Sequence, residues 1–323
     1  MKTRAALVLA LAISSIAYVE TLPAQDAAKT VIAKSASVSH HTASDMMRLY
    51  EDTSVNCGAE NSKPGDQRPA FLCSGIIIRT AVPGNTWNVW DVSPEDEKSG
   101  GVSFSYLRRD VKVGELGGVN ASGFTIFPLY GAYNAPVKKH VMQVMCSFVV
   151  DGWSNFRDLN GCGETSVGMR SRECQDQGIT TADEWVSSYM AAPQGSNAAL
   201  WQCAWDVHTH SKYLTGQAFY ESIKARALLR QRSGGWVFRD RNELRVEKWS
   251  GVAPADLPIQ SFFYVDAEGG TGAGLFYAQV SQKRYKDLTG IFVPIVRVRV
   301  PRAENEDYDF HVLPQDQVIP FPA

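Results

Sequence analysis

Two serines stand at alternate positions in the stretch GGVSFSYLRRD, residues 100–110. In an extended chain, Ser103 and Ser105 would point to one face and the apolar residues between and beside them to the other. Two hydroxyls on one face can hydrogen-bond a bound ligand, or they can face solvent on a half-exposed sheet. We take the serine face as a candidate binding surface, with a solvated face as the alternative.

A cation precedes these serines at the end of an apolar run. Arg79 follows Ile76 to Ile78, a run typical of a strand buried on both faces. A guanidinium group matches phosphate in a bidentate way, so Arg79 could bind an anionic ligand, with Arg108 or Arg109 as a further cation. The aromatic residues nearby that could stack on a ligand ring are Trp87, Trp90 and Tyr106.

Carboxylates that could act with these groups lie in the tail segment PRAENEDYDF. Glu304 and Glu306 are separated by one residue, so they project the same way from an extended chain. Such a pair could hold a ribose or stabilise a developing positive charge. We name Glu306 and Glu304 as the candidate catalytic carboxylates and Glu243, in NELRVEKW, as the substitute. An acidic surface turn is the alternative.

Two further patterns lack part of what their chemistry needs. The segment Gly101-Val-Ser103-Phe-Ser105 lacks the second glycine of a GxSxG nucleophile elbow, which argues against a serine hydrolase. In WDVHTH, Asp206, His208 and His210 could share one strand face, but no further metal ligand stands nearby. We therefore expect no metal site.

The glycine-rich segment EGGTGAG, residues 268–274, invites comparison with phosphate-binding loops. No GK[ST] follows it, and the next residues, LFYAQV, are typical of a strand rather than of the helix that this mechanism needs. The sequence predicts a hairpin loop between strands at 261–266 and 274–280.

The elements that must position these residues follow from periodicity. Strands are expected at 76–79, 102–106, 123–127, 140–150, 261–266, 274–280 and 290–300. A short helix is expected from Thr42, a second from a capping box at Thr181 and Glu184, and a third from Thr215 as N-cap to Gly234. Residues 81–101 are expected to form a long loop. The predicted fold is α+β, mostly antiparallel strands with two or three helices, in one domain over 42–323.

The N-terminus and the cysteines indicate export. Lys2 and Arg4 precede an uncharged run to Ala17, which is typical of a secretory signal over residues 1–17, and 18–41 form a polar, flexible lead-in. Six cysteines follow the signal, which favours disulfides. The pairing expected is Cys57–Cys73, Cys146–Cys203 and Cys162–Cys174. The predicted location is extracellular or periplasmic.

Composition limits the partners. The formal net charge is −2, from 32 basic and 34 acidic residues, so no broad basic surface for nucleic acid is expected. No later segment is long and apolar enough for a membrane span. A small-molecule or protein partner is favoured.

The order of the candidate residues resembles one enzyme class. Arg79, the Ser103-x-Ser105 strand and Glu304-x-Glu306 follow the order of the Arg-Ser-Glu class of ADP-ribosyltransferases. The resemblance implies that the arginine binds the dinucleotide, the serines brace its pocket and the last glutamate holds the nicotinamide ribose. The chain departs from that class in the long separation between the serines and Glu304.

A wider resemblance runs from about residue 57 to the C-terminus. The chain is similar to halovibrin-type exported bacterial proteins in these segments: RPAFLCSGIIIRT (68–80), the W-D-x-S-P element (90–94), SGGVSFSYLRRD (99–110), DGWSNFR (151–157), QCAWDV (202–207), RNELRVEKW (241–249) and LPIQSFFY (257–264). Halovibrins are secreted enzymes that act on NAD as glycohydrolases or ADP-ribosyltransferases. The resemblance implies NAD as a substrate, with no separate cofactor.

Together with the residue patterns, these resemblances imply a secreted NAD glycohydrolase, with ADP-ribosyl transfer to a protein acceptor left open. The expected site contains Glu306, Glu304 and Arg79 as catalytic residues, and the expected substrate-binding residues are Ser103, Ser105, Tyr106, Arg108 and Trp90. Two alternatives remain. The eight tryptophans and twelve tyrosines would suit an exported carbohydrate- or protein-binding module, and the many acidic residues permit another secreted hydrolase.

Overall fold

The structure is a computed structural model. It describes residues 42–53, 75–84, 86–116, 122–126, 140, 142–151, 162, 173–192, 202–208, 214–266 and 272–314. All of these belong to one compact unit, Ser39–Ala323. The expected signal and lead-in, residues 1–41, lie outside the described residues, as do Cys57, Cys73 and His210.

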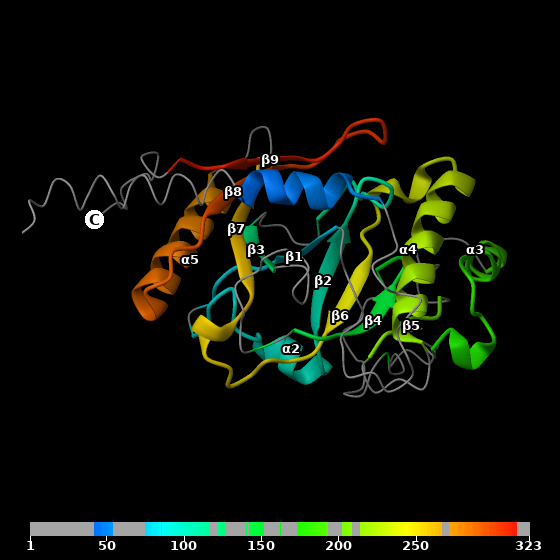
Figure 1. Ribbon diagram of the computed structural model, residues 1–323, viewed down its shortest axis with the longest axis horizontal. Helices are drawn as coiled ribbons and strands as arrows, with labels where there is room; N and C mark the ends of the chain where they lie inside the picture. The colour runs from blue at the N-terminus through cyan, green and yellow to red at the C-terminus, as the bar shows by residue number, and fades with distance from the viewer. Residues whose placement is uncertain are drawn as a thin grey trace, which may run out of the picture. The chain divides into compact units, whose positions relative to one another are not determined.

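A nine-stranded sheet forms the centre of the unit, in the order β5-β4-β6-β2-β1-β3-β7-β8-β9 (Figure 1). The strands are β1 (Ile76–Thr80), β2 (Val102–Leu107), β3 (Ser122–Ile126), β4 (Val144–Phe148), β5 (Trp205–Asp206), β6 (Glu243–Val246), β7 (Ile259–Val265), β8 (Ile295–Arg299) and β9 (Asp309–Val312). Within the described part, β7 and β8 are the one parallel pair. The predicted α+β class, with mostly antiparallel strands, is therefore confirmed.

The described residues contain more α-helices than the two or three expected. These are a helix at 42–51, α2 (Pro94–Ser99), α3 (Ala182–Ala191), α4 (Thr215–Arg232) and α5 (Ala273–Thr289). Three short 3-10 helices are η2 (Gln175–Gln177), η4 (Trp236–Arg239) and η5 (Pro254–Asp256). The capping box of Thr181 and Glu184 is present at α3. At α4 the expected N-cap is wrong by one residue, because Leu214 occupies that position and Thr215 begins the helix.

Residues 274–280 are helical, so the predicted strand there is wrong. The aromatic run LFYAQV has the composition of a strand, but Ala278, Ser281 and Tyr285 are buried at helical spacing in α5. Instead of a hairpin, strand β7 is followed in the chain by helix α5, which crosses over to the parallel strand β8. The aromatic composition favours a strand, but the burial of one helix face outweighs this local strand propensity.

Part of the expected loop at 81–101 is also a helix, α2. Ser93 caps it by accepting a hydrogen bond from the Asp96 backbone, Pro94 occupies its first turn, and Gly100 ends it in the left-handed region at φ 78°. The sequence SPED carries these signals. The helix matters for the site because it lies at the Val102 end of β2. Its residue Asp96 also pairs with Arg79 of β1.

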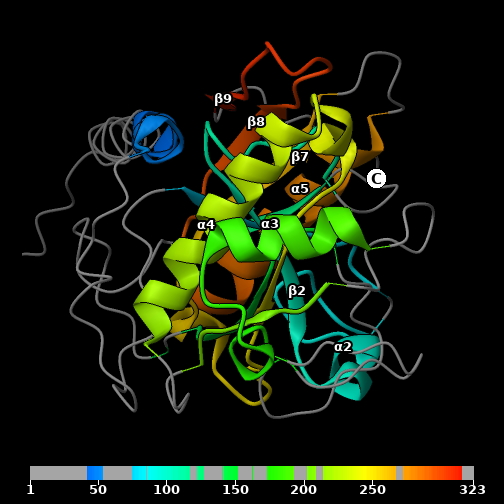
Figure 2. The same ribbon diagram turned by 90° about the vertical axis from the view of Figure 1, so that its right-hand side faces the viewer.

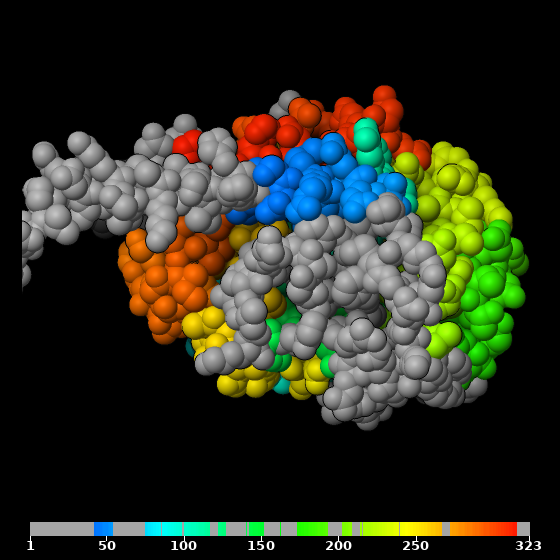
Figure 3. Space-filling model, in the orientation of Figure 1, coloured from blue at the N-terminus to red at the C-terminus, as the bar shows by residue number. Residues whose placement is uncertain are grey.

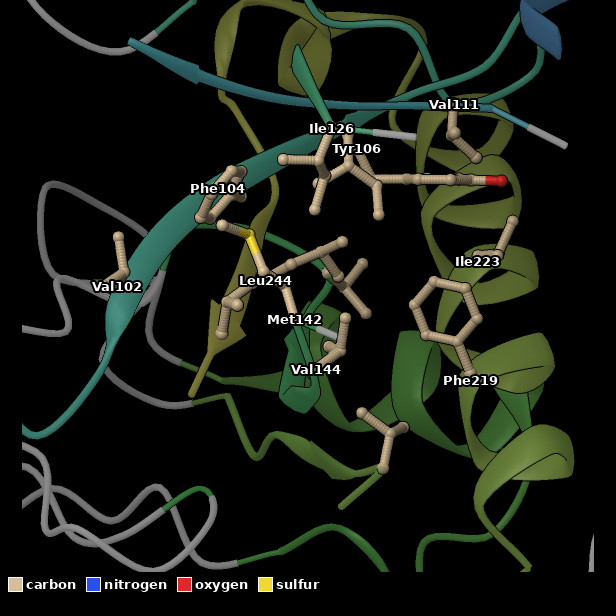
Figure 4. Close-up of a cluster of buried hydrophobic side chains, with 14 of the residues drawn as sticks. Val102, Phe104, Tyr106, Val111, Ile126, Met142, Val144, Phe219, Ile223 and Leu244 are labelled. Carbon is tan, nitrogen blue, oxygen red and sulfur yellow. The ribbon is translucent and has the colours of Figure 1, made fainter. Parts of the chain in front are cut away.

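The main core lies on one face of the sheet. Tyr106 points from β2 toward α4, where Phe219 and Ile223 lie (Figure 4), and Phe104 packs against Phe124 and Trp249. The same cluster contains residues of α3 and α5, among them Trp185. Figure 2 shows α3 and α4 in front of the sheet and the helix at 42–51, in blue, at the left.

A second, smaller core covers part of the opposite face. Met46, Leu49 and Tyr50 of the helix at 42–51 pack against Ile76 and Ile78 of β1. At the surface this helix, blue in Figure 3, borders the C-terminal segment, which is red. Tyr50 Oη of the helix donates a hydrogen bond to Asp307 Oδ1 at 3.1 Å. The alternation of β1 explains the two cores, because Ile77 belongs to the first and its two neighbours to the second.

Two disulfides brace the side of the sheet near β4 and β5, and both contradict the expected pairs. Cys146 of β4 is bonded to Cys162, and Cys174 is bonded to Cys203, with Cα–Cα distances of 5.2 and 4.9 Å. The pairs Cys146–Cys203 and Cys162–Cys174 are therefore wrong. The expected bond Cys162–Cys174 would close a short loop in the sequence, whereas the observed pairing follows from the strand contacts that bring residue 173 beside 204.

Candidate functional site

A group of polar and charged side chains belongs to the sheet face opposite the main core. Register pairs Ser103 of β2 with Arg245 of β6, and Phe104 with Leu244. Since Phe104 and Leu244 both enter the main core, Ser103 and Arg245 lie on the other face. The Ser-x-Ser strand therefore runs beside the sequence Arg241-x-Glu243-x-Arg245.

A cavity of about 250 Å³ opens at this place. This volume lies just below the range of roughly 300–1,000 Å³ that is usual for small-molecule sites. Its lining residues are Ile78, Arg79, Thr80, Ala81, Trp87, Ser93, Asp96, Ser103, Phe104, Ser105, Leu116 and Arg241. The structure thus brings three of the predicted site residues, Arg79, Ser103 and Ser105, to one cavity.

The hydroxyl of Ser103 is one of the polar groups in the cavity lining. Its Oγ is buried and has no hydrogen-bond partner among the described residues. Ser105 Oγ donates to the Asn242 carbonyl at 3.4 Å, and Ser93 Oγ donates to Asp96 Oδ2 at 2.5 Å. Because a buried hydroxyl normally has a partner, Ser103 fits a position that a ligand or water completes.

Arg79 is held by the wall of the cavity. Its Nη2 lies 2.6 Å from Asp96 Oδ2, and its Nη1 donates to the Asp91 carbonyl at 3.1 Å. The guanidinium also lies over the rings of Phe124 and Trp249, at 5.9 and 5.7 Å from their centroids. Burial lowers the pKa of Arg79, and the nearby carboxylate of Asp96 opposes that shift. The Arg79 side chain therefore joins β1 to α2.

Arg245 and Glu243 form a second buried pair near the serines. Arg245 Nη1 lies 4.0 Å from Glu243 Oε1, and both side chains are almost fully buried. Burial lowers the pKa of Arg245, while the charges of Glu243 and Asp96 raise it. A Cβ at Gly101 would lie 3.2 Å from Arg245 Nε and 2.8 Å from Met145, so glycine leaves room for both.

Arg241 is the second arginine that lines the cavity. Its Nε donates to Asp151 Oδ2 at 2.6 Å, and its side chain is 29% exposed. Sequence reasoning missed it. The alternation Arg-x-Glu-x-Arg beside a Ser-x-Ser strand was the available signal, but only the register between β2 and β6 shows that the two patterns are neighbours.

Trp87 supplies an aromatic surface to the cavity. A Cβ at Gly84 would lie 2.0 Å from Trp87 Nε1, so the glycine allows the indole to lie against the backbone. Such a ring can stack on a planar ligand group. Trp90 and Tyr106, by contrast, are buried in the main core and do not line the cavity.

The other predicted cations and carboxylates lie elsewhere. Arg108 holds both oxygens of Asp110, each at 2.6 Å. Glu304 Oε1 lies 2.9 Å from Arg230 Nε, and Glu306 Oε2 accepts from the Arg302 backbone at 2.9 Å. None of these residues lines the cavity.

Glu304 and Glu306 lie near the Leu107 end of β2, whereas α2 lies at the Val102 end. Lys112 Nζ donates to the Glu306 carbonyl, which places the tail turn beside the segment that follows Leu107. Asp96 lies at the other end of β2, in α2 (Figure 1). Asp96, rather than Glu304 or Glu306, is the carboxylate that lines the cavity.

The described residues give no support for a metal site. No group of three or more His, Cys, Asp or Glu side chains within them could hold an ion. Asp206 lies in β5, and His208 donates its backbone N–H to Asp206 Oδ1 at 3.1 Å. Nor does any helix of the described part combine the length and apolar character of a membrane span.

Comparison with protein-family models, with curated proteins and with solved structures found no match.

Proposed function

We propose that this protein is a secreted enzyme that cleaves the bond between nicotinamide and ribose in NAD, at the cavity beside β2. The observation that carries this proposal is the presence of Arg79, Ser103 and Ser105 in the lining of one cavity. The resemblance to halovibrin-type proteins supplies the substrate. Two disulfides in the described part support export, because disulfides persist in oxidising compartments.

The chemistry requires little beyond positioning and one negative charge. The glycosidic bond breaks with its electron pair passing to the nicotinamide nitrogen, and positive charge develops on the ribose. Water then adds to the ribose carbon and releases a proton to solvent. A fixed carboxylate near the ribose stabilises the transition state more than the ground state. We assign this role to Asp96, which the Arg79 ion pair holds in place.

The remaining lining residues have matching roles in the proposal. Ser103 Oγ, which has no partner in the described part, would hydrogen-bond a ribose hydroxyl. Trp87 would stack on nicotinamide or adenine. The alternative of an aromatic binding module loses support, because Trp90, Trp185, Trp205 and Trp249 are core residues.

A comparison of carboxylate variants tests the assignment. Asp96→Asn should lower the rate of nicotinamide release from NAD about a hundredfold or more, because it removes the charge but keeps the shape. Glu304→Gln and Glu306→Gln should keep wild-type rates, because neither residue lines the cavity. Circular dichroism and thermal unfolding of each variant control for folding. Wild-type turnover by Asp96→Asn, or loss in either tail variant, would contradict the assignment.

A further inference from the structure

We infer that Arg241 binds the phosphate-bearing part of the ligand, a nucleoside diphosphate group, in the cavity beside β2. The inference rests on the proposed function and adds to it the residue that recognises the anionic half of the substrate. The sequence had suggested Arg79, Arg108 or Arg109 for this role. Their contacts in the structure, and those of Arg245, make each of them unsuitable.

Arg79 and Arg245 have their charges compensated inside the protein. The Arg79 side chain is 6% exposed and bound to Asp96, and the Arg245 side chain is 2% exposed and lies beside Glu243. To bind a phosphate, either guanidinium would have to leave a buried carboxylate behind, and breaking a buried ion pair in this way is strongly unfavourable. Neither is available to an entering anion.

Arg108 and Arg109 are excluded by position. Arg108 is held in a bidentate contact by Asp110, and Arg109 Nη2 lies 3.0 Å from Asp307 Oδ2. Neither residue lines the cavity. The two arginines that line it are Arg79 and Arg241.

Among the described residues, Arg241 keeps both of its terminal nitrogens for a ligand. Only its Nε is engaged, with Asp151, and within the described part of the chain its terminal nitrogens have no hydrogen-bond partner. The two terminal nitrogens of a guanidinium form a planar fork that matches two phosphate oxygens. The side chain is partly exposed, so binding does not require a buried ion pair to break.

Asp151 positions Arg241 for this task. Besides the side-chain contact, the Asp151 backbone N–H donates to the Arg241 carbonyl at 2.7 Å. These two contacts fix both the main chain and the inner edge of the guanidinium. A cation held in this way loses little conformational entropy when it binds an anion. Ser103 Oγ, in the lining of the same cavity, can donate to a further oxygen of the ligand.

Binding of ADP, measured by isothermal titration calorimetry on the oxidised protein, tests the inference without relying on bond cleavage. Arg241→Ala should weaken ADP binding about tenfold to a hundredfold, the loss expected for charge-assisted hydrogen bonds. Arg241→Lys should fall between, because it keeps the charge but not the fork. The matched control is Arg109→Ala, which removes a surface arginine paired with an aspartate outside the cavity and should change the affinity less than twofold.

The outcomes separate this inference from the proposed function. Three results would overturn the role of Arg241. The first is equal affinity for ADP in wild type, Arg241→Lys and Arg241→Ala, and the second is an equal loss of affinity in Arg241→Ala and Arg109→Ala. The third is no binding of ADP by wild type. If the protein releases nicotinamide but its affinity for ADP does not depend on Arg241, the proposed function is supported and the role of Arg241 is contradicted. ADP binding that depends on Arg241, without nicotinamide release, would overturn the function and leave the anion site.

Discussion

Arg79 and Asp96 connect the cavity to the core of the protein. The arginine packs between Phe124 and Trp249 on one side of β1, and its carboxylate partner lines the cavity. The same ion pair therefore contributes to stability and, in our proposal, fixes the charge that acts on the ribose. Its two members should respond differently to substitution.

Replacing Arg79 should cost stability. Arg79→Met should lower the free energy of unfolding by about 3 kcal/mol, because it removes the cation that pairs with the mostly buried Asp96 carboxylate. The double variant with Asp96→Asn should lose less than the sum of the single losses, since the two residues are coupled. Urea denaturation of the wild type, the two single variants and the double variant measures the single losses of stability and the coupling between the two residues. Strictly additive losses would show that the pair is energetically irrelevant.

Ser103 should show the opposite behaviour. Because its Oγ has no partner in the described part, Ser103→Ala should change the free energy of unfolding by less than about 0.5 kcal/mol. The same variant should slow nicotinamide release about tenfold or more, since a hydrogen bond to the substrate is lost. Ser105→Ala serves as comparison, because its hydroxyl contacts Asn242. A Ser103→Ala variant that releases nicotinamide at the wild-type rate would contradict the assignment of Ser103 to the site.

At the scale of elements, the Asp307 carboxylate is one of the contacts that join the helix at 42–51 to the tail. Asp307 accepts from Tyr50 Oη and Lys112 Nζ, and it pairs with Arg109. Burial by itself would raise the pKa of Asp307, but the hydrogen bond and charge of Lys112, with Tyr50 and Arg109, lower it overall. The ionised form is therefore favoured by folding.

This contact should weaken in acid. Because the pKa of Asp307 is lower in the folded protein than its ordinary value of 3.8, its contribution is complete above that value and is lost as the pH falls through the folded pKa. Its size should be only about 0.5 kcal/mol, because the side chain is 36% exposed. The free energies of unfolding of wild type and Asp307→Asn, from urea denaturation, should differ at pH 6, and the difference should shrink as the pH falls below 3.8. A constant difference would contradict this account.

The sequence predicts the elements in which apolar residues recur at a regular spacing. It does not predict an element that buries charged side chains. β1, β2, α3 and α4 follow their apolar spacing. The strand β6 places Glu243 and Arg245 inside the protein, which alternation of apolar residues cannot indicate. At α5, aromatic composition favours a strand, whereas packing selects a helix.

The candidate site was predictable only in part for the same reason. The Ser-x-Ser face and Arg79 follow from local patterns. Asp96 depends on a short helix and Arg241 on the register between two strands that are far apart in sequence. The tail glutamates have a suitable pattern, but the return of the chain after β8 places them beside Arg230 and Lys112.

For the whole molecule, the disulfides should contribute strongly to stability. Cys174 and Cys203 are 29 residues apart in sequence, and their bond attaches the segment before α3 to β5. Closing a loop of this length stabilises a protein by roughly 3–4 kcal/mol through the unfolded chain. The double variant Cys174→Ala and Cys203→Ala should lose about this amount in urea denaturation at neutral pH. A loss below about 1 kcal/mol would contradict it, and peptide mapping of the wild type under non-reducing conditions would check the pairing.

The central claim concerns the reaction itself, so the most direct test is chemical. Purified, oxidised protein is incubated with NAD, and nicotinamide and ADP-ribose are quantified by chromatography over time, beside a Ser103→Ala variant that folds normally. The account predicts equal amounts of the two products from wild type and at least tenfold slower release from the variant. No nicotinamide from wild type at high enzyme concentration, with or without added acceptor proteins, would contradict it.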